Sequence, residues 1–240
     1  MIDLHCHLLP GVDDGARNLE EAVAMARMAI EEGITHAVLT PHFHQGIYDN
    51  QVSTLKPVFE TFKEQLAESQ IPLEIAVAGE VRISTDLLHL LPAGNVPFIG
   101  SIDDTPVMLL ELPYSHIPPG TDNLLNWLHK NNVKTMIAHP ERNREIISNP
   151  SAIKQLKLGG TMFQLTVGSF SEMFGEKVRD TAETLLLDGY ADIVATDAHR
   201  IDKRPPTVKA GLDAISALVG PDIMKRLSFD TPKAISQVLF

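Results

Sequence analysis

Residues 2–40 of the chain are IDLHCHLLPGVDDGARNLEEAVAMARMAIEEGITHAVLT, and this stretch has the pattern of a strand, a helix and a second strand. Ile2–Cys6 and Thr35–Thr40 are short apolar or β-branched runs of the length expected for buried strands. Two such runs separated by a helical pattern are typical of a βαβ unit, in which the strands are parallel. The opening of the chain therefore predicts an α/β fold.

The helix between these strands has recognisable ends. Asn18 can cap its first turn, Glu21 follows three residues later as in a capping box, and Gly33 can end it. The apolar side chains expected on its buried face are those of Leu19, Val23, Ala26 and Ile30.

The same alternation continues along the whole chain. Seven strands are predicted, at Ile2–Cys6, Thr35–Thr40, Leu73–Ala78, Val107–Leu112, Thr135–Ala138, Thr161–Thr166 and Asp192–Thr196. Further helices are predicted to begin near Val52, Ser84, Thr121, Pro150 and Ser171, and the segments Pro206–Val219, Pro221–Leu227 and Thr231–Leu239 are helical in pattern, the last with Thr231 as its cap. We interpret residues 1–240 as one domain, a (β/α)7 barrel of the TIM type.

The composition limits the classes of function. The chain has 240 residues and a formal net charge of -11, which argues against a general nucleic-acid binder because such proteins need a basic face. The single cysteine, Cys6, cannot form an internal disulfide. The N-terminal segment lacks the pattern of a signal peptide, and no apolar run is long enough to cross a membrane, so we expect a cytoplasmic protein without membrane insertion.

Histidines and carboxylates occur where the predicted strands end, most of them separated by about 30 to 40 residues, the length of one βα unit. In a parallel barrel the carboxyl ends of all strands meet at one rim, where the active sites of such barrels lie. Alternation along a strand also places both residues of an H-x-H or D-x-H pair on the same side. The side chains expected to meet at this rim are those of His5, His7, His42, Glu80, Glu111, His139, Asp197 and His199.

Imidazole and carboxylate groups together are typical ligands of zinc, iron and manganese. With Asp14 the set has five histidines and four carboxylates, too many for one ion and suitable for two or three. Three divalent ions would carry more charge than four carboxylates and would attract a phosphate dianion. A water that bridges two ions is then the expected nucleophile, because metal coordination lowers its pKa.

Two arginines follow predicted ligands closely. Arg142 lies in AHPERN, three residues after His139, and Arg204 lies in HRIDKRPP, shortly after His199. A guanidinium can bind two phosphate oxygens at once, so we expect Arg142 and Arg204 to bind the substrate phosphate.

Several alternative interpretations concern single residues. His44 shares a side with His42 if the strand continues, although His42 is the preferred ligand, and Asp13 and Asp14 are also suited to a turn. His5-Cys6 is similar to the start of the cysteine phosphatase loop His-Cys-x5-Arg, but position 12 is Val12, so a thiolate mechanism is disfavoured. Isolated histidines are usually structural, and we expect no role at the site for His36, His89, His116 and His129.

The ordered motifs HCHLLPGVDDGA, TPHFH, AGE, LLELPY, AHPERN and TDAHRIDKRPP resemble those of the PHP (polymerase and histidinol phosphatase) superfamily. The DDGA, AHPER and DAH…RPP elements are similar to those of the bacterial manganese-dependent protein tyrosine phosphatases of capsule and exopolysaccharide operons. The resemblance covers essentially the whole chain.

This resemblance implies a distorted (β/α)7 barrel, the PHP fold, and a site for three ions, with Mn²⁺ expected and Fe, Zn or Co as alternatives. It implies that His5, His7, Asp14, His42, Glu80, Glu111, His139, Asp197 and His199 are the ligands, that Asp13 is only a neighbour of Asp14, and that Arg142 and Arg204 bind phosphate. The implied substrate is phosphotyrosine on a membrane-associated bacterial tyrosine kinase that controls polysaccharide synthesis.

The leading hypothesis is therefore a phosphoric monoester hydrolase specific for protein phosphotyrosine. The alternatives are a phosphatase for a small molecule such as histidinol phosphate, an exonuclease, which the acidic charge disfavours, and a non-catalytic kinase-binding module. Within the loop of residues 43–50, Phe43, Ile47 and Tyr48 are candidates for contact with an aromatic substrate.

Overall fold

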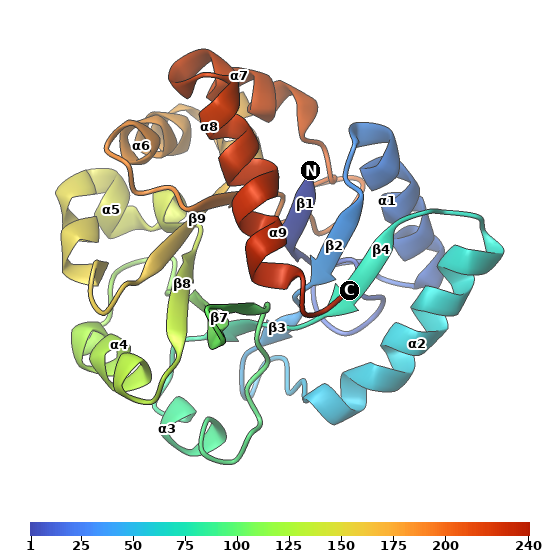
Figure 1. Ribbon diagram of the computed structural model, residues 1–240, viewed down its shortest axis with the longest axis horizontal. Coiled ribbons are helices and arrows are strands. Elements are labelled where there is room, and N and C mark those ends of the chain that lie inside the picture. Colours follow the sequence, from blue (N-terminus) through green and yellow to red (C-terminus); the bar gives the residue numbers. More distant parts are fainter.

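The computed structural model describes residues 1–240, and its strands form a ring that is surrounded by helices (Figure 1). One parallel sheet has the order β1-β2-β4, and a second has the order β10-β9-β8-β7-β5-β3, with β6 antiparallel to β7. The strands are β1 (Ile2–Cys6), β2 (His36–Leu39), β3 (His42–Phe43), β4 (Glu74–Val77), β5 (Glu80–Arg82), β6 (Ser101–Ile102), β7 (Thr105–Glu111), β8 (Lys134–Ala138), β9 (Met162–Thr166) and β10 (Ile193–Ala195). The predicted α/β fold with parallel strands is confirmed.

The two sheets are joined because the second and third predicted strands each continue past an interruption. Pro41, which has no backbone N–H, separates β2 from β3, and Ala78-Gly79 separates β4 from β5. Backbone N–H groups of Ala78 and Glu80 still donate to Leu39 O and Pro41 O at 2.8 and 3.1 Å. A Cβ on Gly79 would lie 2.4 Å from the Phe43 ring, so this close crossing requires glycine.

Between β10 and β1 the regular ladder is replaced by a side chain. The buried Asp3 carboxylate accepts hydrogen bonds from the Thr196 N–H at 3.0 Å and from Thr196 Oγ1 at 2.5 Å. Beyond them, the Asp197 N–H donates to His5 O and the His7 N–H donates to Ala198 O, both at 2.7 Å. The segments of β10 and β1 are thus connected by irregular contacts and a single bridge between Cys6 and Ala198, without a regular strand ladder.

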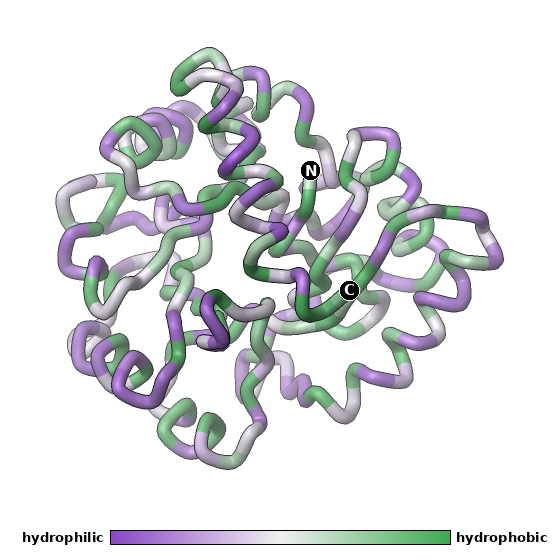
Figure 2. The backbone as a smooth tube through the Cα atoms, in the orientation of Figure 1, coloured by the Kyte–Doolittle hydropathy of each residue, from purple (hydrophilic) through white to green (hydrophobic).

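The helices of the ring largely follow the predicted positions. They are α1 (Leu19–Glu32), α2 (Val52–Glu68), α3 (Leu87–Leu90), α4 (Thr121–Lys130), α5 (Arg144–Ser148), α6 (Glu176–Leu187), α7 (Lys209–Val219), α8 (Pro221–Lys225) and α9 (Thr231–Ser236), with 3₁₀ turns at Pro140–Arg142, Pro150–Leu156 and Val167–Ser171. Hydrophilic and hydrophobic residues alternate along the outer helices (Figure 2), because one face of each helix packs on the strands. None of the helices is both long and apolar enough to span a lipid bilayer.

The capping prediction for α1 is confirmed in part. Asn18 accepts from the Glu21 N–H at 2.9 Å, and Gly33 ends the helix in the left-handed conformation (φ 94°). The Glu21 carboxylate, however, does not complete a capping box with the Asn18 N–H. It accepts hydrogen bonds from the N–H and the guanidinium of Arg17, the residue before the cap, at 2.9 and 2.8 Å.

Several helices differ from the prediction: α5 was not predicted, and α7 begins at Lys209 rather than Pro206. The segment at Pro150 is a 3₁₀ turn, and a 3₁₀ turn at Val167–Ser171 delays α6 until Glu176. Helix α3 begins at Leu87 rather than Ser84. Thr231 is not a cap, because its backbone angles are helical (φ -67°, ψ -47°). Helix α8 continues through a π-helical turn, Arg226–Asp230, into α9, so Thr231 lies inside a longer helical segment.

Apolar side chains fill both sides of the strands. A large cluster between the strands and helices contains Cys6, Met25 and Phe163. A smaller cluster inside the ring contains Leu4 and Leu109, and Ile235 of α9 joins it from the amino end of the strands. Helix α9 lies across the middle of the ring in Figure 1. The amino end is therefore closed by packing, which leaves the carboxyl end for chemistry.

We expect Thr196→Val to lower the free energy of unfolding by about 1–3 kcal/mol, because the Asp3 carboxylate and the Ala198 N–H would each lose a buried hydrogen-bond partner. Urea denaturation measures this difference. Thr184→Val on the exposed face of α6 is the matched control and should change stability by less than about 0.5 kcal/mol. Equal effects of the two substitutions would contradict a structural role for the Asp3–Thr196 contact.

Candidate metal centre

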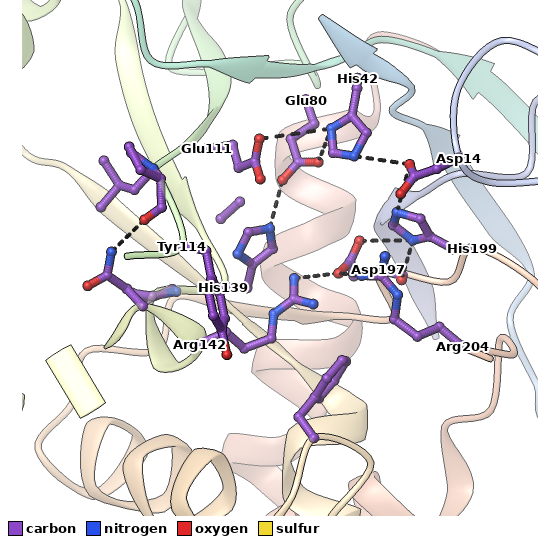
Figure 3. Close-up of a pocket in the computed structure, with 16 residues that line it drawn as sticks. Asp14, His42, Glu80, Glu111, Tyr114, His139, Arg142, Asp197, His199 and Arg204 are labelled. Carbon is purple, nitrogen blue, oxygen red and sulfur yellow. Dashed lines mark hydrogen bonds and ion pairs between the residues drawn. The ribbon is translucent and has the colours of Figure 1, made fainter. Parts of the chain in front are cut away.

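A cavity of about 300 Å³ opens at the carboxyl ends of the strands (Figure 3). Both predicted arginines and seven of the nine predicted ligands line it, namely Asp14, His42, Glu80, Glu111, His139, Arg142, Asp197, His199 and Arg204. His5 and His7 lie directly behind the lining residues and are fully buried. The structure thus brings together all eleven residues that the sequence singled out, whereas none of His36, His89, His116 and His129 lines the cavity.

The ends of the strands place these side chains. His5 is in β1, His42 and Glu80 begin β3 and β5, and Glu111 ends β7. His139 and Asp197 follow β8 and β10 with left-handed backbone angles (φ 34° and 50°), a conformation that is uncommon for residues other than glycine.

The deepest group of side chains combines two histidines and two carboxylates. His5 Nε2 lies 3.3 Å from Glu80 Oε2 and 3.2 Å from Asp197 Oδ1. His7 Nε2 lies 3.4 Å from each of the same two oxygens. One ligand atom from each of these four residues lies within 4.8 Å of the others, which is close enough to hold one ion.

Two further groups share members with the deepest one. His7, Asp14, His42 and His199 form the second group, and His42, Glu80 and Glu111 form the third. His42 contacts Glu80 Oε2 at 3.0 Å and Asp14 Oδ1 at 3.3 Å, so it connects these groups. His139 belongs to none of the three groups, but its Nε2 lies 2.8 Å from Glu80 Oε1 at their edge.

Unpaired buried atoms show that these groups suit cations. Glu80 Oε2, Asp197 Oδ1 and His199 Nε2 are buried and have no hydrogen-bond partner. A buried polar atom without a partner is costly. Each of these three atoms faces other ligand atoms of the same groups, so bound divalent ions would satisfy all three.

The pKa values of two of the five histidines, His139 and His199, are consistent with this arrangement, whereas, despite burial, neighbouring carboxylates raise the pKa values of the other three. Burial lowers the pKa of His139 to about 4, with the Arg142 guanidinium adding to the effect. Burial and the neighbouring His7 likewise lower the pKa of His199 to about 4, so both rings are neutral at pH 7, as metal ligands must be. Burial alone would lower the pKa of His42, but the carboxylates of Glu80 and Asp14 raise it to about 10. A cation would compete with that proton.

Two residues outside the predicted ligand set orient the histidines: Asp13, which the resemblance implied to be only a neighbour of Asp14, and Gln164, which the sequence did not identify. Asp13 Oδ2 lies 2.7 Å from His7 Nδ1 and also accepts from the His42 N–H at 3.0 Å. Gln164 Oε1 lies 2.9 Å from His5 Nδ1. Such contacts fix the ring that carries the ligand nitrogen. The only sequence signal for Gln164 is a polar residue in the buried strand MFQLT.

Arg142 and Arg204 approach the same oxygen from different loops. Both guanidinium groups donate to Asp197 Oδ2, Arg204 at 2.7 Å. Burial would raise the pKa of Asp197, but Arg142 and the surrounding cations hold it well below its usual value. Arg142 Nε is buried and has no partner. The two arginines therefore place positive charge at the wall of the cavity.

Aromatic side chains line the cavity at a place that the sequence did not predict. Tyr114 and Phe174 are lining residues, and the Arg142 guanidinium lies 4.8 Å from the centroid of the Phe174 ring. Of the predicted loop residues, Tyr48 stacks on His42 and lines, with Phe43, a separate cavity of about 120 Å³. Ile47 lines neither cavity.

Cys6 and His44 are also outside the site. The Cys6 side chain is buried on the helix side of β1, with Sγ 3.7 Å from Val38 O, as expected from strand alternation. The His44 N–H donates to Tyr48 O, and His44 lines only the separate cavity. His42 alone of the two histidines belongs to a group of ligand atoms.

Known proteins resemble this chain over most of its length or all of it. A tyrosine-protein phosphatase of Bacillus subtilis, YwqE, is 34% identical over 204 residues, which are 85% of this chain and 79% of YwqE. The tyrosine-protein phosphatase CpsB of Streptococcus pneumoniae is 28% identical over 244 residues, covering 98% of both chains. A solved structure also matches, with a TM-score of 0.91 and 30% identity, and the match covers 100% of this chain and 96% of that one. It belongs to a set of crystal structures of YwqE and CpsB, which are described there as "unique metal-dependent tyrosine phosphatases".

The family model for capsular polysaccharide synthesis proteins of the CpsB/CapC type matches residues 1–237. This match confirms the resemblance on which the sequence interpretation rested. The chain therefore belongs to the CpsB/CapC family.

Proposed function

We propose that this protein is a metal-dependent phosphatase that hydrolyses phosphotyrosine in proteins. The observation that carries the proposal is the convergence of Arg142 and Arg204 on Asp197, beside the three groups of ligand atoms. Arginine forks suited to phosphate thus lie next to side chains suited to divalent cations. The activities named for YwqE and CpsB agree with this arrangement.

The metal ligands in this proposal are His5, His7, Asp14, His42, Glu80, Glu111, His139, Asp197 and His199, and three Mn²⁺ ions are the expected occupants, with Fe, Zn or Co as alternatives. Divalent ions bound there would lower the pKa of water toward neutrality and neutralise phosphoryl charge. Three such ions would outweigh the four carboxylates, so the cavity would attract a dianion. Asp13 and Gln164 keep His7 and His5 in the orientation that this site needs.

The arginines would hold the phosphoryl group of the substrate. Asp197 fixes both guanidinium groups through one oxygen, so their remaining N–H groups are directed in advance. Such preorganised donors stabilise the charge of the transition state without reorganisation during the reaction. Arg142 and Arg204 are therefore assigned to phosphate binding.

The aromatic lining residues favour tyrosine over small alkyl phosphates such as histidinol phosphate. Tyr114 and Phe174 line the same cavity as the arginines, so a phenyl ring attached to the bound phosphate would lie near two aromatic side chains. An aromatic pair stabilises a complex by about 0.5–1.5 kcal/mol more than the burial of its apolar surface alone.

The physiological substrate would be a phosphotyrosine segment of a bacterial tyrosine kinase that controls polysaccharide synthesis. The description of the matched family as a capsular polysaccharide synthesis family supports this assignment. The same proposal includes a cytoplasmic location and one catalytic domain that comprises residues 1–240.

The decisive experiment is turnover of a phosphotyrosine peptide by chelator-treated protein that is titrated separately with Mn²⁺, Zn²⁺ and Mg²⁺. Activity should be absent without metal and should be restored by Mn²⁺. Histidinol phosphate serves as the competing substrate in the same titration. Full activity of the metal-free protein would refute the proposal, and preference for histidinol phosphate would replace its substrate.

Arg204→Ala should lower kcat/KM for the phosphotyrosine peptide by about 10²–10³, the effect of removing one preorganised donor. Arg200→Ala, at an arginine that pairs with Asp202 and does not line the cavity, is the matched control and should stay within about twofold. The bound metal should be measured in both variants. A loss of activity that tracks loss of metal would show that Arg204 acts through Asp197 instead of through phosphate.

Phe174→Ala should lower kcat/KM for the phosphotyrosine peptide by about tenfold, since roughly 1.4 kcal/mol corresponds to that factor. The rate with β-glycerophosphate, which has no ring, should change little. Steady-state kinetics with both substrates on one preparation gives the comparison. An equal loss for both substrates would rule out recognition of the ring by Phe174.

A further inference from the structure

A second, larger groove adjoins the cavity of the candidate metal centre. It has a volume of about 730 Å³, and its lining includes Tyr114, Arg144, Phe174, Lys177 and Asp180. Tyr114 and Phe174 also line the cavity of the candidate metal centre, so these two residues form the boundary between the two spaces. A peptide whose phosphotyrosine enters the cavity would extend past this boundary.

The groove carries unpaired positive charge although the chain as a whole is acidic. Arg144 and Lys177 are exposed and appear in none of the ion pairs of the protein, whose net charge is -11. The acidic lining residue, Asp180, is already engaged by the Arg179 guanidinium at 2.8 Å. Two cations in this groove are thus free to interact with a ligand.

The local structure does not account for these cations. Arg144 and Lys177 stand in the first turns of α5 and α6, where the helix dipole favours acidic residues over basic ones. The Arg144 guanidinium lies 4.8 Å from the centroid of the Tyr114 ring, which holds it beside the boundary. Tyr114 itself is 57% exposed, so the stacked pair faces the solvent where a peptide would pass.

We propose that this groove is a substrate subsite, in which Arg144 and Lys177 bind an acidic side chain close to the phosphotyrosine in the substrate peptide. The inference rests on the proposed phosphatase function and adds to it a preference in the surrounding sequence. The positive charge of the groove favours a carboxylate as the bound group. Because Tyr114 and Phe174 line both the groove and the cavity, this carboxylate would belong to the same peptide as the phosphotyrosine.

The test uses phosphotyrosine peptides in which one glutamate is placed in turn at each of the three positions before and after the phosphotyrosine, each paired with a glutamine version. In the manganese-loaded wild-type protein, glutamate at one or more positions should raise kcat/KM about two- to fivefold over glutamine, the range of an exposed ion pair. The advantage should shrink as salt is added.

The double variant Arg144→Glu and Lys177→Glu should reverse this preference and leave turnover of p-nitrophenyl phosphate unchanged. Glutamate suits the first turn of a helix, so the substitutions should not unfold α5 or α6. The control is Lys56→Glu and Lys63→Glu, which changes the net charge equally on the exposed face of α2, on the opposite side of the ring from α5 and α6 (Figure 1). It should retain the wild-type preference.

The outcomes separate the subsite from the function on which it rests. Equal kcat/KM values for every glutamate and glutamine pair, with all peptides hydrolysed, would overturn the subsite alone. The same shift in both double variants would assign the preference to net charge and would also overturn it. Failure to hydrolyse any phosphotyrosine peptide would overturn the proposed function together with the subsite.

Discussion

The arrangement of the site depends on the contacts that the Asp197 carboxylate makes. One of its oxygens faces His5, His7 and His199, while the other accepts from Arg142 and Arg204. The proposed metal-binding side and the proposed phosphate-binding side of the cavity are therefore connected through the two C–O bonds of one carboxylate. The left-handed backbone at Asp197 and the adjacent Asp3–Thr196 contact hold this carboxylate in place. Asp197 consequently takes part both in the contacts that connect β10 with β1 and in the contacts of the site.

The convergence of the predicted ligand residues could be foreseen because parallel strands impose it. A residue at the carboxyl end of any strand in such a ring must reach the same rim, so spacing along the sequence suffices to bring Glu80, Glu111 and His139 together. Alternation within β1 likewise separates Cys6 from His5 and His7. These inferences need only the register of single strands and no knowledge of packing.

The contacts that the sequence did not reveal depend on distant partners. Gln164 matters because His5, in another strand, lies opposite to it, and nothing in the segment MFQLT indicates that neighbour. Phe174 reaches the cavity because a 3₁₀ turn precedes α6 and moves the start of that helix. The continuity of α8 with α9 overrides the local preference of Thr231 for a cap. In each case the tertiary environment decides between local alternatives.

The closure of the amino end of the ring by α9 also determines where the two ends of the chain lie. Ile2 is paired with His36 at the start of β2, and the Phe240 ring packs edge-on against His36 with 5.0 Å between the ring centroids. Both ends thus lie beside the start of β2 (Figure 1), whereas the cavity is lined by residues at the carboxyl ends of the strands. A fused domain at either end would leave the entrance open to a large protein substrate, and a short linker between the ends would permit circular permutation of the chain.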